Sequence, residues 1–282
     1  MCKTVYEVDE VPFGNVSERL QQPPDVGVSV VILALGAPEN EESRDASGDS
    51  KDRTGRLWLP LVRRVRQPFL GDWALPGGGL QCGISLEQAA FAALESTTDM
   101  HPRYLEQLYT FGDPKRSSGG LPMVSIVYWA LVGSAEIRTC TEGGNVQWFP
   151  ADELPALAFD HRGIIEYALW RLRNKIEYST IAARFVGERF TLAQLRSVHE
   201  AVLGRSLDPA NFRRHILGSG ELEDTGTTVI QGRSRPASVY RYRRAETTSS
   251  LFSPSVDLAH ARADGSRVSQ SAMTNAHNKG VS

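Results

Sequence analysis

The sequence has few cysteines and no stretch that resembles a secretion signal or a membrane span. Only three of its 282 residues are cysteines, and Cys2, Cys82 and Cys140 do not have the CxxC spacing of a zinc or redox site. The opening MCKTVYEVDEVPFG lacks a basic segment followed by an apolar one, and no apolar run approaches ~20 residues. We therefore expect a cytoplasmic protein without a disulfide framework or a membrane anchor.

The chain also lacks a strong net charge. Its 31 Lys and Arg residues and 33 Asp and Glu residues give a formal charge of -2, but a whole-chain sum hides segregation between regions. Between residues 181 and 244 there are eleven arginines and six acidic residues, so 11 - 6 gives +5. This surplus is typical of a surface that contacts nucleic-acid phosphates.

Apolar patterning predicts an α/β fold in the first part of the chain. One helix is expected at residues 85–98, among strands at 28–35, 57–65, 104–111, 123–132 and 146–149. Together they predict an α/β/α sandwich. From residue 160 onward, apolar residues recur at helical spacing as far as Tyr178.

The chain divides into two domains with flanking segments. We assign an N-terminal segment (1–24), a ligand-binding domain (25–160), a connecting helix (161–180), a basic helix-helix-hairpin domain (181–244) and a disordered tail (245–282). The polar run between residues 37 and 55 is interpreted as an insertion between two strands.

Residues 73–100, WALPGGGLQCGISLEQAAFAALESTTDM, resemble the Nudix signature in framework. Gly78 takes the first glycine, Leu94 the aliphatic position before the Glu pair, and Met100 the last position. The chemistry is missing, because non-acidic residues take the signature's Glu and Arg-Glu positions: Ile84, Ala92, Ala93, Ser96 and Thr97, with Asp99 at the closing glycine.

On a helix, positions 93, 96 and 97 share one face. Active members use this face to hold divalent cations, which need carboxylate oxygens. Ala, Ser and Thr supply no anionic ligand, so we predict no metal site, no catalytic residue and no hydrolysis. The alternative is a metal-dependent ADP-ribose or nucleotide hydrolase that uses Glu87, Glu95 or Asp99.

A Nudix fold without catalytic groups can bind a nucleoside diphosphate derivative without cleaving it. Arginine forms bidentate bonds to diphosphate, an aromatic face stacks on adenine, and glycine lets the backbone approach a ligand closely. The candidate ligand-binding residues are Arg64, Arg66, Phe69, Trp73, Gly77, Gly78, Gly79 and Arg116. Trp73 is expected to be mainly structural, and the FGDPKR segment around Arg116 resembles that of ADP-ribose-type Nudix proteins.

The basic domain is predicted to be a winged helix. Thr191 is placed to cap a helix that ends at Gly204, and Asp208 and Pro209 begin a second helix. A hairpin with Gly232 in its turn would form the wing. The candidate DNA-binding residues are Thr191, Arg196, Asn211, Arg213, Arg214, His215, Arg233 and Arg235.

Three segments, LAFDHRGIIEYALWRLRNKIEYS, RFTLAQLRSVHEAVLGRSLDPANFRRHIL and GRSRPASVYRY, resemble NrtR-type, NAD-related transcriptional regulators. The resemblance covers roughly residues 25–244, with Gly79 in place of a usual aromatic. It implies a homodimeric bacterial repressor of NAD biosynthesis or salvage genes that binds a palindromic operator in double-stranded DNA. The implied effector is ADP-ribose or a related NAD nucleotide, with no other cofactor. A module that binds a protein or RNA is a further alternative.

Overall fold

The computed structural model describes residues 24–36, 55–98, 102, 104–117, 122–133, 137, 144–177, 180–230 and 236–243. The segments 1–23 and 245–282, almost all of the polar run between 37 and 55, and the hairpin tip with Gly232, Arg233 and Arg235 lie outside these residues. Within the described part, no helix is long and apolar enough to cross a membrane.

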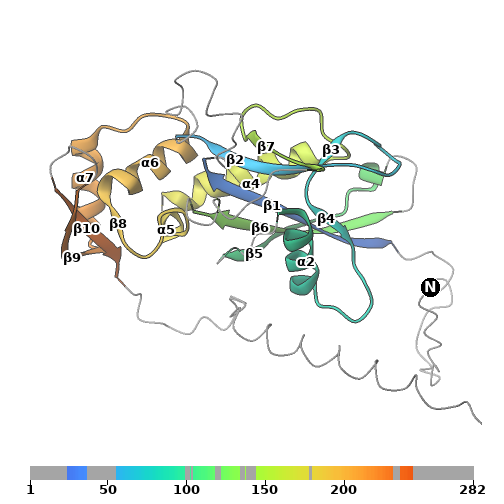
Figure 1. The fold of residues 1–282 in the computed structure, drawn as a ribbon, viewed down its shortest axis with the longest axis horizontal. Helices are drawn as coiled ribbons and strands as arrows, with labels where there is room; N and C mark the ends of the chain where they lie inside the picture. Colours follow the sequence, from blue (N-terminus) through green and yellow to red (C-terminus); the bar gives the residue numbers. More distant parts are fainter. Residues whose placement is uncertain are drawn as a thin grey trace, which may run out of the picture.

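The first domain is built on a mixed sheet (Figure 1). Its strands are β1 (Asp25–Leu35), β2 (Leu57–Arg63), β3 (Trp73–Ala74), β4 (Gly77–Gly79), β5 (Leu105–Phe111), β6 (Met123–Val132) and β7 (Val146–Pro150). They follow the order β3-β2-β1-β6-β5, while β4 pairs with β1 and β7 with β2. The central strands β1 and β6 run parallel and are buried along most of their length. All five predicted strands are confirmed, with small shifts at their ends.

One helix covers each face of the sheet, because successive residues of a strand point to opposite faces. Val28, Val30 and Ile32 of β1 pack toward α2 (Leu86–Thr98), together with Ala90 and Leu94. On the other face, Val31 and Leu33 pack in a second cluster with residues of α4 (His161–Ile176). The predicted α/β/α sandwich is confirmed, as are the apolar positions of α4: Ile164, Ile165, Ala168, Leu169 and Leu172.

The second domain has the order expected of a winged helix. It contains η4 (Thr180–Ala182), α5 (Ala183–Val186), β8 (Phe190–Thr191), α6 (Leu192–Leu203), α7 (Pro209–Gly218), β9 (Leu222–Val229) and β10 (Ala237–Tyr242). The three strands form a small sheet in the order β8-β10-β9. Thr191 and Gln194 make a capping box at the start of α6, and Gly204 ends this helix with a φ of 66°. Asp208 caps α7 and Pro209 occupies its first turn.

The two domains share one apolar cluster. Residues of α4, Phe185 of α5 and Leu195 of α6 belong to the same core as the sheet residues that face α4. Gly133, directly after β6, allows this close packing, since a Cβ at this position would lie 2.7 Å from the carbonyl oxygen of Phe185. Near the other end of α6, Arg173 Nε of α4 donates to the Val202 carbonyl at 3.2 Å. The helix α4 is therefore packed against both the sheet and the winged helix.

Candidate functional site

The face of α2 that holds metal ions in active Nudix enzymes carries no carboxylate at Ala93, Ser96 or Thr97. Ala93 packs against the core, and the Ser96 hydroxyl donates to the Ala93 carbonyl at 3.3 Å, so it serves its own helix. Glu95 is exposed. Among the described residues, which exclude Asp99, no group of three His, Cys, Asp or Glu side chains could hold a metal ion.

The half-buried Glu87 is the other acidic residue of α2. Its Oε1 lies 3.4 Å from the Tyr128 hydroxyl, which donates to it. Burial, with the nearby Glu87 carboxylate, raises the pKa of Tyr128 to about 12, so this hydroxyl remains protonated. Glu87 thus accepts a hydrogen bond from a hydroxyl of the sheet, that of Tyr128, which stays protonated at neutral pH.

The glycine segment is a strand, β4, and not the loop that the sequence suggested. Residues Gly77–Gly79 pair with Ser29, Val28 and Gly27 of β1. A Cβ on Gly77 would lie 2.3 Å from the Val28 carbonyl oxygen, so glycine is required there for strand packing. At Gly78 and Gly79 a Cβ would meet nothing within 4 Å, and both residues are exposed. These two positions are open to solvent.

Arg116, which was predicted to contact a diphosphate, makes several hydrogen bonds within the protein. Its side chain is only 5% exposed, and its Nε and Nη2 donate to the two carboxylate oxygens of Asp160, each at 2.9 Å. Its Nη1 donates to the Phe111 carbonyl at 2.8 Å. All three nitrogens of the guanidinium are therefore used within the protein. Arg116 fixes the 3-10 turn η3 (Pro114–Ser117) to the start of α4.

Arg64 is also engaged internally. Its Nε donates to the Pro68 carbonyl at 2.8 Å, and its guanidinium carbon lies 4.6 Å from the centre of the Phe159 ring. The Phe69 ring packs edge-on against the Phe159 ring, with 4.8 Å between the ring centres. Phe69 and Phe159 have φ values of 63° and 56°, a left-handed conformation that is uncommon for bulky residues and is often found at binding sites.

The other two predicted contacts of this region differ in exposure. Arg66 is exposed. Trp73 packs edge-on against Phe149 with 5.0 Å between ring centres and borders the core, which agrees with its expected structural role. Arg66 is therefore the arginine of the predicted set that a diphosphate could reach directly.

His161 is a residue that the sequence analysis did not single out. It is buried, and its Nδ1 accepts a hydrogen bond from the Leu75 backbone N–H at 3.0 Å. Burial lowers the pKa of His161 to about 4; the Asp160 carboxylate opposes this effect, while the weaker effects of the Arg116 and Arg64 charges act in the same direction as burial. The ring is therefore neutral at neutral pH, as an acceptor at Nδ1 requires. Its importance could not be inferred from spacing, because Leu75 is distant in sequence.

Three segments that were predicted to bind the ligand thus converge on the start of α4. Arg64 stacks on Phe159, Arg116 pairs with Asp160, and the Leu75 N–H, next to the glycine strand, bonds to His161. The residues before and at the beginning of α4 are consequently contacted from three segments of this candidate ligand site.

The helix α7 presents the second candidate site. Phe212 and Ile216 face inward, whereas Asn211, Arg213, Arg214 and His215 are exposed, as predicted for the first three. Arg214 Nη2 donates to Asn211 Oδ1 at 2.7 Å, so these two side chains are ordered together. The arrangement is a row of arginine and amide groups on the outer face of a short helix.

Comparisons with known proteins identify a related family for each of the two domains. Residues 182–242 match the NrtR DNA-binding winged helix domain, and residues 50–168 match the Nudix domain. The ADPR responsive transcriptional repressor NtrR of Acinetobacter baylyi is 33% identical over 193 residues, which are 67% of this chain and 76% of the relative. The chain belongs to the NrtR family. The resemblance found in the sequence is confirmed, and the protein is an NrtR-type regulator.

A solved NrtR structure extends the agreement to three dimensions. The crystal structure of Shewanella oneidensis NrtR complexed with a 27mer DNA is 33% identical, with a TM-score of 0.60, and the match covers 77% of this chain and 93% of that chain. The Nudix part also resembles the ADP-ribose pyrophosphatase of Methanocaldococcus jannaschii, at 33% identity over 112 residues, which are 39% of this chain and 66% of that enzyme.

Two residues predicted to contact DNA have internal roles in this NrtR-family chain. Thr191 is only 3% exposed, and its Oγ1 accepts the Gln194 backbone N–H at 3.2 Å. Arg196 is half-buried, with its Nε 3.5 Å from Oε1 of Glu200 one turn later. Thr191 thus serves as the helix cap that the sequence also predicted, and the Arg196 side chain is only 27% exposed.

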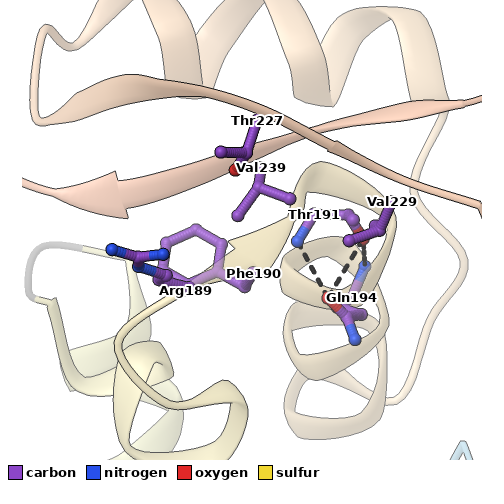
Figure 2. A pocket seen from close by; sticks show the side chains of 7 residues that line it. All are labelled: Arg189, Phe190, Thr191, Gln194, Thr227, Val229 and Val239. Atoms are coloured by element: carbon purple, nitrogen blue, oxygen red, sulfur yellow. Dashed lines mark hydrogen bonds between the residues drawn. The ribbon is translucent and has the colours of Figure 1, made fainter.

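A hollow of about 300 Å³ lies beside the start of α6, between this helix and the β9-β10 hairpin (Figure 2). The capping pair of Thr191 and Gln194 forms one side, and Arg189 is exposed at its margin. The lining residues are Arg189, Phe190, Thr191, Gln194, Thr227, Val229 and Val239. These residues come from three separate segments of the chain, so their proximity could not be inferred from sequence spacing.

Proposed function

We propose that this chain is an ADP-ribose-responsive transcriptional repressor that releases its operator when ADP-ribose, or a related NAD nucleotide, binds to the Nudix domain. The observation that carries the proposal is the exposed row of Asn211, Arg213, Arg214 and His215 on α7, in a domain matched by the NrtR DNA-binding family. The Acinetobacter baylyi relative, named an ADPR responsive repressor, supports the same effector.

The chemistry of α7 suits double-stranded DNA. In winged-helix and helix-turn-helix proteins, residues near the start of the recognition helix reach base edges in the major groove. Arginine pairs with guanine and asparagine with adenine through two hydrogen bonds each. Asn211 and Arg214 are already oriented by their mutual bond. RNA is less suited, because the deep and narrow major groove of its duplex does not admit a helix.

The Nudix domain supplies the sensor. The exposed guanidinium of Arg66 suits a diphosphate, and the exposed backbone of Gly78 and Gly79 permits close approach of a ligand. The Phe69 and Phe159 rings near Arg64 supply an apolar surface for a base.

The same domain is proposed to bind without hydrolysing. Mg²⁺ would require carboxylate oxygens, and Ala93, Ser96 and Thr97 offer none. A hydrolase remains the second candidate, favoured by the likeness to the Methanocaldococcus jannaschii pyrophosphatase. Release of AMP from ADP-ribose in the presence of Mg²⁺ or Mn²⁺ would support that candidate.

The helix α4 is suited to couple the two domains. Its beginning is held by Arg64, Leu75 and Arg116, and its other end packs on the winged helix, where Arg173 bonds to Val202. Sixteen residues make a rigid rod of about 24 Å. A ligand that displaces the start of this rod would rotate or shift the winged helix at its end.

Such a shift is most effective in a homodimer on a palindromic operator. Its half-sites lie about one DNA turn, ~34 Å, apart, and a small rotation brings the two recognition helices out of register. Typical coupling of ~1 to 3 kcal/mol would weaken operator binding by roughly 5- to 150-fold. The regulated genes are proposed to be those of NAD biosynthesis or salvage, in a cytoplasmic setting where the operator is accessible.

The test is a mobility-shift titration of the purified chain on the DNA upstream of its own gene. We expect a specific complex that ADP-ribose dissociates, while AMP and ribose 5-phosphate, each carrying only part of the ligand, act weakly. Operator affinity that does not change with ADP-ribose would contradict the proposed effector. Equal binding to unrelated duplex DNA would contradict the proposed operator recognition.

A further inference from the structure

The start of α4 differs from the starts of the two main helices of the second domain. Thr191 and Asp208, the N-cap residues of α6 and α7, are extended, with ψ values of 157° and 123°, and their side chains accept a backbone N–H of the first turn. Asp160 is the N-cap residue of α4, but its ψ is 18° and its side chain makes no cap hydrogen bond to the described residues of that turn. The sequence thus provides α4 with a good capping residue whose carboxylate is used elsewhere.

The Asp160 carboxylate is bound by Arg116 instead. Nε and Nη2 of Arg116 donate to its two oxygens, each at 2.9 Å, and Nη1 donates to the Phe111 carbonyl at 2.8 Å. The Arg116 side chain is 5% exposed, whereas the Asp160 side chain is 33% exposed. Solvent therefore reaches this pair from the side of the carboxylate, and the bond to Phe111 keeps the guanidinium directed toward that side.

A diphosphate is suited to the position that the Asp160 carboxylate occupies. Carboxylate and phosphate groups both present two oxygens to a guanidinium in the same bidentate arrangement. Phe159 lies directly before Asp160 in the chain, and its ring contacts the proposed base surface at Arg64 and Phe69. A ligand that places its base on this surface therefore brings its diphosphate within reach of Arg116.

The backbone around Asp160 is held on both sides. The Ala158 N–H donates to a carbonyl of β3 at 2.8 Å, and His161 Nδ1 accepts a backbone N–H from the residue after β3 at 3.0 Å. Between these two fixed points, Phe159 has a left-handed φ of 56°, which is uncommon for a bulky residue. If Asp160 turned to the extended conformation of a capping residue, Phe159 and the first turn of α4 would have to move with it.

We propose that the diphosphate of the ligand replaces the Asp160 carboxylate on Arg116, and that the released carboxylate then caps α4. It would accept an N–H of the first turn, as Thr191 and Asp208 do in their own helices. The two arrangements exclude each other, because capping requires the extended backbone that Asp160 lacks while it is paired with Arg116. Asp160 is thus a positioning residue. The inference rests on the proposed function for the consequence of this exchange at the winged helix.

Isothermal titration calorimetry of the full chain with ADP-ribose, without DNA, tests the exchange. Asp160→Asn keeps the ability to cap but loses the charge that holds Arg116, so the dissociation constant for ADP-ribose should fall by about 5-fold or more. The matched control is Asp152→Asn, which neutralises another arginine-paired aspartate, 66% exposed and bound to Arg56. The control should bind ADP-ribose like the unmodified chain. Unchanged or weaker binding by Asp160→Asn would overturn the exchange.

Fluorescence anisotropy with labelled operator tests the capping step. Without ligand, Asp160→Asn should bind the operator as weakly as the unmodified chain does with saturating ADP-ribose, and ADP-ribose should then change its affinity less than about 2-fold. Asp160→Ala also releases Arg116 but supplies no cap, so it should bind the operator more tightly than Asp160→Asn. Thermal melting confirms that both variants fold. Equal operator affinity of the two variants would overturn the capping step.

The unmodified chain provides a test that does not depend on a variant. ADP carries the base and the diphosphate, whereas adenosine carries no phosphate. At concentrations that saturate the site, ADP should release the operator and adenosine should not. Release by adenosine would overturn the exchange and leave the sensor in place. Operator affinity that ignores ADP-ribose would contradict the proposed function, whereas tighter ADP-ribose binding by Asp160→Asn would still support the exchange, so the two failures are distinguishable.

Discussion

Arginines predicted to contact a ligand or DNA occur in both domains, and the structure pairs Arg64 and Arg116 internally but exposes Arg213 and Arg214. In the Nudix domain Arg64 donates to a carbonyl and stacks on Phe159, and the buried Arg116 forms a bidentate pair with Asp160. On α7, Arg213 and Arg214 extend from the protein surface. The first set secures the beginning of α4, and the second is available to an outside partner.

The chain thus pairs arginines internally near the start of α4, which links the two domains, and exposes them on α7. A buried charge must be paired, because an unpaired charge in the protein interior keeps the free-energy cost of its desolvation without a compensating attraction. An exposed arginine remains hydrated until DNA replaces the water and counterions.

The largest effect is expected from the double substitution Arg213→Ala, Arg214→Ala. Two lost arginine contacts at ~1 to 3 kcal/mol each should weaken operator binding by about 1000-fold, or about 4 kcal/mol. Fluorescence anisotropy with labelled operator measures this change, and the free energy of unfolding should stay unaltered because both side chains are exposed.

The control for this pair is Lys115→Ala, which removes an exposed cation from the Nudix domain. It should change operator affinity only slightly. If Lys115→Ala weakens binding as strongly as the double variant, affinity depends on total charge rather than on the face of α7.

Elements with a strong local signal could be predicted from the sequence. The continuous apolar runs of β1 and β6, the helical period of α4 and the caps at Asp208 and Gly204 depend on residues close in the chain. The strands β3 and β4 were missed because two or three residues cannot show an alternating pattern, and three glycines more often indicate a loop.

The site was predicted by residue type and only partly by role. Asn211, Arg213 and Arg214 follow from the helical period, since Phe212 and Ile216 define the inner face. The roles of Arg116 and His161 depend on Asp160 and Leu75, which are 44 and 86 residues away. A single sequence contains no sign of such pairings, so an arginine in a ligand-like motif could not be distinguished from a structural one.

The substitution Arg116→Ala tests the buried ion pair between Arg116 and Asp160. Removing one partner of a buried ion pair leaves the other charge uncompensated, which costs ~3 to 5 kcal/mol, and the partial exposure of Asp160 places the loss near the lower end, about 3 kcal/mol. Urea unfolding measures it. In the double variant Arg116→Ala, Asp160→Asn the loss should be smaller than the sum of the two single losses. Additive losses would mean that the pair is not coupled.

The pH dependence of stability tests the neutral ring of His161. Its pKa is about 4 in the folded protein against an ordinary value of 6.5, so between these values the unfolded chain binds more protons. Stability therefore falls as the pH decreases from 6.5 toward 4, and His161 accounts for about 2 kcal/mol of loss between pH 7 and pH 5.

The variant His161→Gln isolates this contribution. Its amide oxygen can accept the Leu75 N–H without titrating, so its stability should fall by about 2 kcal/mol less over the same range. Part of the decline persists, because burial and the nearby His215 charge also lower the pKa of His199 to about 4. Equal pH dependence of the two proteins in urea unfolding would show that His161 does not titrate as described.

The smallest effect is expected at Thr191, which was predicted both to cap α6 and to contact DNA, and which caps α6 in the structure. Thr191→Ala removes the acceptor for the Gln194 N–H and should lower the free energy of unfolding by about 1 kcal/mol, measured by urea unfolding. Thr191→Ser keeps the hydroxyl and should recover most of that loss. If Thr191→Ala instead weakens operator binding strongly while unfolding stays unchanged, the hydroxyl contacts DNA and belongs with Arg213 and Arg214. The expected result places Thr191 with Arg116, among the polar residues that act within the protein so that α7 can act outside it.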